Sequence, residues 1–306
     1  MAFDGLKQRI ARDIELAGGR HDEPEIYGGE PGDPGLCGGP ESVSWEIHGD
    51  LASLAVAGTA AIVMEVLHPS VMHGVYTQSA YRSDPFGRAR NTLGYVLRTT
   101  FGSTRGATAV IDRVKKIHAR VGGTRADGIA YQALDPELIA WVHTCIPWAV
   151  MTAYDRYARP LSREEKDRYL AEQAVVGRMG GADSVPESVD ELEAYVDAMR
   201  PHLAMNEQTV EFMGFLAGRV DQAPVPWRER WDRWVAIRAS MGLMPEWARR
   251  MTGTFQLAPL QRALFTPRDR LAARMIRWAY PEVPCKRLAL ARATGAAVPA
   301  RSDCAA

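Results

Sequence analysis

The sequence has no net charge, because its 306 residues contain 37 basic and 37 acidic side chains. A neutral chain produces no summed field that would draw it toward nucleic acid or an anionic membrane surface. We therefore expect no nucleic-acid partner. A small or neutral molecule is the partner that this charge balance favours.

Cysteine is also scarce. Cys37, Cys145, Cys285 and Cys304 are scattered, and no pair has the CxxC spacing. This pattern argues against a zinc site and against a disulfide framework. The first residues mix charges of both signs where a signal peptide would need an apolar core. Together these features predict a reducing compartment, the cytoplasm.

No apolar run is long enough to predict a membrane span. The most apolar segment covers residues 51–69, and Ser53, Thr59 and Glu65 interrupt it before Pro69 ends it. A span needs about 20 consecutive apolar residues. We expect instead a helix that is buried on all sides.

Strand signals are nearly absent as well, since no run of alternating β-branched residues and no hairpin dipeptide between apolar runs occurs. The sequence therefore predicts an all-α protein with one core. Residues 1–44 should form an extended lead-in, rich in Gly and Pro, with a short helix. Residues 45–285 should form the helical domain, and residues 286–306 a flexible tail.

Helix signals recur along the domain. Residues 85–101 and 103–121 predict two helices, the second stopped by Gly122 and Gly123. Asp135 and Pro136 start a long helix with Pro147 inside it. Ser162 with Glu165, and Ser188 with Glu191, have the spacing of capping boxes. Further helices are predicted over 206–217, 227–241, 245–251 and 267–279.

Three histidines occur in helical, apolar settings: His68, His118 and His143. On the helix predicted to end near residue 121, His118 is in line with Ile111, Val114 and Val121, while Lys115, Lys116 and Arg120 point away. A buried histidine is commonly a hydrogen-bonded core residue, and the alternative is a ligand for a metal or substrate. We assign no role to His21, His48 and His202.

Two other polar patterns allow more than one interpretation. Glu65 and His68 have the i, i+3 spacing of di-iron helices, but no second copy of the pair exists, which favours a buried acid with a polar partner. Arg88, Thr92, Tyr95 and Thr99 form a polar stripe. It either faces water or forms a polar wall inside an apolar cavity.

The sequence lacks the motifs of several classes of enzyme. No G-x-S-x-G elbow and no phosphate-binding loop occurs. The aromatic stripe of Trp227, Trp231 and Trp234 is more typical of a core than of a nucleic-acid surface in a neutral chain. No flavin or nicotinamide motif is present, so any reductant would be external.

A set of short motifs resembles a known family in order and spacing. These motifs are "LHPSVMHGV", "YRSDPFGRARNTLGYVLRTTFGS", "VKKIHARVGG", "ALDPELIAWVHTCIPWAVMTAYDRY" and "PLSREEKDRYLAEQAVVGRMGG". They resemble the MpaB-type oxygenase family, which includes the catalytic domain of the latex-clearing proteins, the rubber oxygenases. The resemblance covers about residues 45–200, with a weaker part to about 280.

The resemblance implies a globin-like helical domain with additional helices and haem b as the cofactor. It implies that His118 binds the iron, and that Arg88 and Thr92, one helical turn apart, lie near the haem. Arg88 would hold a haem propionate or act as a catalytic group on bound dioxygen. His68 and His143 match further histidines of the family and would support the cofactor, with His143 as the reserve ligand.

The chain also departs from the family pattern. Relatives often carry an acid and a histidine where Thr77 and Gln78 stand here, and His73 replaces a small residue. Rubber is therefore not the expected substrate. The resemblance instead implies a haem-dependent oxygenase that uses dioxygen or peroxide, with an external electron donor where one is needed. Its substrate would be a small, mostly hydrophobic metabolite that undergoes hydroxylation, desaturation, coupling or oxidative cleavage. The alternative is a haem-binding sensor or carrier without turnover.

Overall fold

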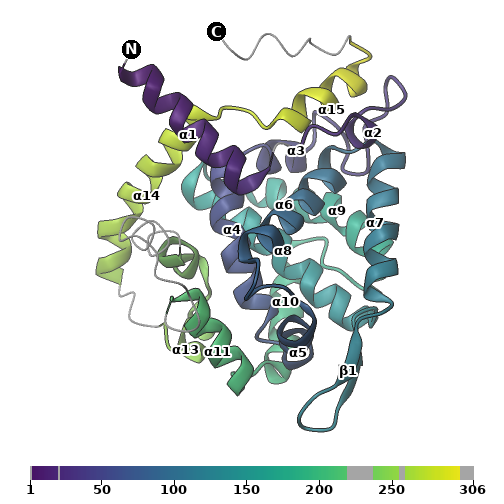
Figure 1. Cartoon of the computed structure of the whole chain (residues 1–306), viewed down its shortest axis with the longest axis vertical. Coiled ribbons are helices and arrows are strands. Elements are labelled where there is room, and N and C mark those ends of the chain that lie inside the picture. Colours follow the sequence, from purple (N-terminus) through teal and green to yellow (C-terminus); the bar gives the residue numbers. More distant parts are fainter. Residues whose placement is uncertain (1, 20, 219–236, 255–258, 297–306) are drawn as a thin grey trace.

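The computed structural model describes residues 2–19, 21–218, 237–254 and 259–296 (Figure 1). Helices dominate, which confirms the all-α prediction, whereas the globin-like arrangement stays a prediction. The helices of the first half are α1 (Ala2–Gly18), α2 (Pro24–Tyr27), α3 (Val43–His48), α4 (Leu51–Glu65), α5 (Pro69–Gln78), α6 (Pro85–Phe101) and α7 (Thr104–His118). Those of the second half are α8 (Pro136–Tyr157), α9 (Arg163–Gly180), α10 (Val189–Met199), the 3-10 helix η1 (Arg200–His202), α11 (Glu207–Leu216), α13 (Glu246–Met251), α14 (Pro259–Ala279) and α15 (Pro284–Thr294).

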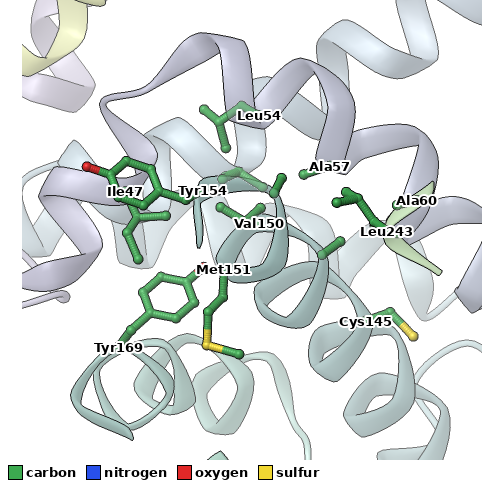
Figure 2. Packing of buried hydrophobic residues seen from close by; sticks show 14 of the residues in the cluster. Ile47, Leu54, Ala57, Ala60, Cys145, Val150, Met151, Tyr154, Tyr169 and Leu243 are labelled. Atoms are coloured by element: carbon green, nitrogen blue, oxygen red, sulfur yellow. The ribbon is translucent and has the colours of Figure 1, made fainter. Parts of the chain in front are cut away.

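The core is built around α4 and α8, which pack side by side (Figures 1 and 2). Small side chains on α4, among them Ala57 and Ala60, are fully buried and let the two helices approach closely. Val150 and Met151 of α8 meet them from the other side. The prediction that this helix is buried on all sides is wrong for one face, where Ala55 and Gly58 are exposed and Leu51, Thr59 and Ile62 are only partly buried.

The local signals explain where α6 and α7 begin. Asp84 accepts a hydrogen bond from the Gly87 amide, and Ser103 accepts one from the Gly106 amide, so each caps the free N–H groups of its helix. Gly102 and Ser103 alone connect the two helices, which pack against each other.

The end of α7 corrects one prediction. The helix stops at His118 rather than Val121, and the Val121 amide instead donates to the His118 carbonyl oxygen in the turn that follows. A short antiparallel hairpin, β1 (Gly122–Thr124) and β2 (Ala130–Gln132), comes next and was not predicted. Two strands of three residues carry too little alternation to be recognised in a sequence.

The capping signals of the second half are largely confirmed. Ser162 and Glu165 form a complete capping box at the start of α9. Ser188 accepts from the Glu191 amide at the start of α10, while the Glu191 carboxylate accepts from the Glu187 amide, so this box is only half formed. The helix predicted over 227–241, with its tryptophan stripe, lies outside the described residues as far as residue 236.

Both ends of the chain contain more structure than expected. Residues 286–294, predicted to begin a flexible tail, belong to α15. Arg292 of α15 is buried and donates to the carbonyl oxygens of Asp33, Tyr27 and Phe101. The Arg292 side chain therefore joins α15 to the Gly- and Pro-rich lead-in. The lead-in is held against the domain by a residue more than 250 positions away in sequence.

No single described helix is long and apolar enough to cross a membrane. The pair α4 and α5 passes the length and composition test only together, and the two helices meet at a bend of 111°.

Candidate functional site

His118 is the last residue of α7 and is partly buried. Burial lowers the pKa of its imidazole, so the ring is neutral at pH 7. Its side chain makes no hydrogen bond with any residue that the structure describes. A neutral imidazole without such a partner keeps a nitrogen lone pair available for a ligand bond.

The surroundings of His118 differ in part from the predicted helix face. Ile111 is buried and Val114 half-buried, as expected for the apolar side of α7. Lys115, however, is also half-buried, and its Nζ donates to the Met179 carbonyl oxygen at 3.4 Å rather than pointing into water. Lys115 therefore joins α7 to α9 beside the histidine.

Arg88 lies near the start of α6, 13 residues before Phe101, and His118 lies 14 residues after Thr104. The end of α5 lies beside both segments: Gln78 Nε2 donates to the carbonyl oxygen of Gly122, four residues after His118, and Gln78 is followed by Ser79. The Arg88 guanidinium donates to the Ser79 hydroxyl at the end of α5. Burial lowers the pKa of Arg88, and the negative charge of Glu65 acts against this.

Thr92 departs from the expected arrangement. It is exposed, and its hydroxyl donates to the Arg88 carbonyl oxygen at 3.2 Å. Further along the predicted polar stripe, Thr99 is buried and donates to the carbonyl oxygens of Tyr95 and Val96. The stripe therefore neither faces water throughout nor forms one continuous polar wall.

Glu65, the last residue of α4, is buried beside these groups. Its backbone carbonyl accepts a hydrogen bond from Trp141 Nε1 at 3.1 Å, but its carboxylate has no hydrogen-bond partner among the described residues. Burial raises the pKa of Glu65 to about 7, and Arg88 opposes this shift. The sequence predicted a polar partner for this buried acid. No described residue bonds to the carboxylate, and Arg88 acts on it only through its positive charge.

His68 and His143 are both engaged in local structure. His68 caps α5 by accepting from the Ser70 amide through Nδ1, and His143 Nε2 donates to the Gln173 carbonyl oxygen at 2.9 Å. Burial lowers the pKa of each ring to about 4; nearby positive charges contribute for His68. In both cases one ring nitrogen supports local structure, and the other makes no hydrogen bond with a described residue.

Of two small pockets among the described residues, neither is lined by His118, Arg88 or Thr92. One lies between α8, α9 and α10 and includes His143 and Thr144 in its wall. Thr144 is buried there, and its hydroxyl has no hydrogen-bond partner among the described residues. The other lies between α1, α6 and the segment before α15.

The donor set fits a haem held by one imidazole. His118 offers an uncommitted neutral ring, and Arg88 has N–H donors beyond the one it gives to Ser79. Within the described ranges, no three His, Cys, Asp or Glu side chains converge in a manner that would hold a metal ion. Glu65 and His68 therefore lack the further ligands that a di-iron site needs.

One buried group was missed by the sequence interpretation. His48, assigned to a loop margin, ends α3 and is completely buried, with Nδ1 2.6 Å from Thr100 Oγ1 and Nε2 2.8 Å from Tyr169 Oη. The three residues come from α3, α6 and α9. No local pattern could reveal this network, because its members are separated by 52 and 69 residues in sequence.

Comparisons with known proteins bear on the same region. Residues 45–280 match the family described as ER-bound oxygenase mpaB/B'/Rubber oxygenase, catalytic domain. Curated relatives include uncharacterized proteins of Mycobacterium bovis and Mycobacterium tuberculosis, each 27% identical over 135 residues, which is 42% of this chain and 51% of the relative. The chain thus spans about half the length of the curated relatives it matches. No solved structure matches.

Proposed function

This chain belongs to the mpaB/rubber oxygenase catalytic-domain family, and on that premise we propose that it is a haem b-dependent oxidoreductase of the oxygenase type. Its substrate is a small, mostly hydrophobic metabolite, oxidised with dioxygen or peroxide. The observation that supports this most directly is His118, a neutral imidazole with no hydrogen-bond partner among the described residues, at the end of the helix that follows the one carrying Arg88.

Each residue of the site has a distinct part in the proposal. His118 binds the cofactor through one ring nitrogen, and the end of α7 fixes the direction of that ring. Arg88 donates hydrogen bonds to a carboxylate or to an oxygen atom of the reacting molecules. Thr92 ties the first turns of α6 together through the Arg88 carbonyl oxygen.

Haem, when bound, supplies an iron centre that activates dioxygen or peroxide. In a mostly hydrophobic substrate the oxidised bond is a C–H or C=C bond. A reductant, where the reaction needs one, comes from an external donor.

The test is an absorption spectrum of the purified protein, with bound haem quantified as pyridine haemochrome. We expect near-unit haem in the wild type and loss or a shift of the Soret band in His118→Ala. His202→Ala is the matched control, because His202 is exposed and has no hydrogen bond to its side chain that involves a described residue. Absence of haem after supplementation during expression would contradict the proposal.

A second measurement distinguishes an enzyme from a sensor or carrier. Apolar substrates are incubated with the haem-loaded protein and either dioxygen with a reductant or peroxide. Oxidant-dependent product formation supports turnover. A six-coordinate iron without product across the panel would favour the sensor or carrier.

A further inference from the structure

Exposed apolar side chains gather on two helices that touch each other. Eleven large apolar side chains of the described residues are exposed, and six of them belong to α1 and α14. They are Phe3, Leu6 and Leu16 of α1 and Leu271, Met275 and Trp278 of α14. α1 packs against α14, and both helices lie at the periphery of the molecule (Figure 1). Single exposed apolar residues are ordinary on a protein surface, whereas a group of them marks a place of interaction.

The exposed row of α14 lies opposite its buried face. Successive residues of an α-helix are about 100° apart, so Leu271, Met275 and Trp278 fall within an arc of about 60°. Asp269 and Ala273 lie on the other side of the helix and are buried, where α14 packs on α4 and α8. The contact of α14 with the core therefore does not explain the row.

The charge around this row is positive. The only acid of α14, Asp269, is buried and bound to Arg238. Arg268 and Arg274 are exposed and flank the row, one at each edge. Residues 265–296 contain seven basic and two acidic side chains, although the chain as a whole is neutral. The positive charge is thus local, and the neutral sum over the whole chain hides it.

We propose that α14, with α1 beside it, docks this protein on an anionic lipid surface. Leu271, Met275 and Trp278 enter the boundary between headgroups and acyl chains, while Arg268 and Arg274 contact lipid phosphates. Arginine side chains can cover apolar surface with their stems and keep their charge among the headgroups. Tryptophan has an apolar ring with one polar N–H, which suits the same boundary. The docked helix lies in the plane of the surface and does not span it.

A second copy of the chain is a less favourable occupant of this face. Two copies related by a two-fold axis would bring Arg268 and Arg274 of both faces to one patch. Like charges that meet at an interface oppose association. An anionic lipid surface carries the opposite charge and adapts its shape to a helix that lies on it.

Docking would bring the protein to the phase in which apolar molecules concentrate. The substrate class of the proposed function is mostly hydrophobic, so this use of the surface rests on the proposed function. Lipid binding itself requires neither haem nor turnover. The two proposals can therefore fail separately.

The first measurement is co-sedimentation of the full chain with vesicles. One set is made of phosphatidylcholine, and the other contains phosphatidylglycerol as well. We expect binding to the anionic vesicles that weakens as salt is added. Binding to phosphatidylcholine alone should be weaker by about fivefold for each of the two flanking arginines. Equal binding to both sets, or none to either, would overturn the inference.

Variants test whether this face makes the contact. Leu271→Ser should weaken binding to the anionic vesicles about tenfold, and Arg274→Gln about fivefold. Val210→Ser is the matched control, because Val210 is exposed by 58%, the same fraction as Leu271. Val210 lies on α11, whose charged residues are the acids Glu207 and Glu211, so its substitution should leave binding unchanged. Wild-type binding in Leu271→Ser and Arg274→Gln would overturn the inference.

Quenching of tryptophan fluorescence by brominated acyl chains shows whether the row enters the lipid. We expect quenching in the wild type and less of it in Trp278→Phe; equal quenching in both would place the lipid contact elsewhere and reject the proposal. A wild type that binds no vesicles but forms a dimer, which Leu271→Ser dissociates, would assign the face to a second copy and also reject it. Vesicle binding by a protein that holds no haem would sustain this inference and reject the haem-dependent function.

Discussion

The Nε2 atom of His143 lies 2.9 Å from the carbonyl oxygen of Gln173, and this contact joins α8 to α9. The ring also packs against Gly177, where an added Cβ would come within 2.5 Å of it. His143 therefore serves as a spacer and hydrogen-bond donor between two core helices. Its position explains why a histidine in an apolar helix need not be a ligand.

We expect His143→Ala to lower the free energy of unfolding by about 1–3 kcal/mol, because it leaves a cavity and removes the hydrogen bond to the Gln173 carbonyl oxygen. Haem stoichiometry should not change, in contrast to His118→Ala. Urea unfolding and pyridine haemochrome on the same preparations measure both quantities. Loss of haem in His143→Ala, with the fold intact, would transfer the ligand role to His143.

His48 should make the protein sensitive to acid. Its pKa is lowered to about 3 by burial, whereas an unfolded chain has an ordinary histidine near 6.5. Below about pH 6.5 the unfolded state therefore binds a proton that the folded state does not. The contribution of His48 to folding stability is complete above that pH and is lost as the pH falls toward 3. His68 and His143, each with a pKa lowered to about 4, act in the same direction.

We expect the free energy of unfolding of the wild type to fall by a few kcal/mol between about pH 7 and pH 5. The fall should be smaller in His48→Gln, which has no charge to gain, even though this variant is less stable at pH 7. Urea titrations at the two pH values give the comparison. An equal fall in both proteins would show that His48 is not protonated on unfolding.

Gly106 should tolerate no side chain. It is buried in the first turn of α7 against the lead-in, and an added Cβ would lie 2.4 Å from the Ile26 carbonyl oxygen and 2.9 Å from Ile26 Cα. Since backbone atoms cannot move aside cheaply, we expect Gly106→Ala to cost roughly 2–4 kcal/mol.

Gly58 provides the matched control within another helix. An added Cβ there meets nothing within 4 Å. Gly58→Ala should therefore raise stability by about 0.5–1 kcal/mol, because alanine loses less conformational freedom in a helix. Thermal unfolding of the two variants and the wild type measures the loss of stability in Gly106→Ala and the gain in Gly58→Ala. A neutral Gly106→Ala would mean that α2 does not lie against α7 in solution.

The helical class and many helix limits followed from local chemistry. Ser162 and Ser188 cap the helices that the sequence assigned to them. Such signals act over three or four residues, so they can be recognised without any knowledge of the fold. The histidine and arginine of the candidate site were also selected in advance, but by resemblance to a family and not by spacing alone.

The remaining features depended on residues that are distant in sequence. The buried His48 network, the clamp of Arg292 on the lead-in and the exposed position of Thr92 are consequences of how the helices pack. Glu65 gives the clearest case. Sequence showed an acid in an apolar helix. Only the tertiary packing buried this acid and so raised its pKa, against the opposing charge of Arg88, because burial and charge depend on neighbours from other helices.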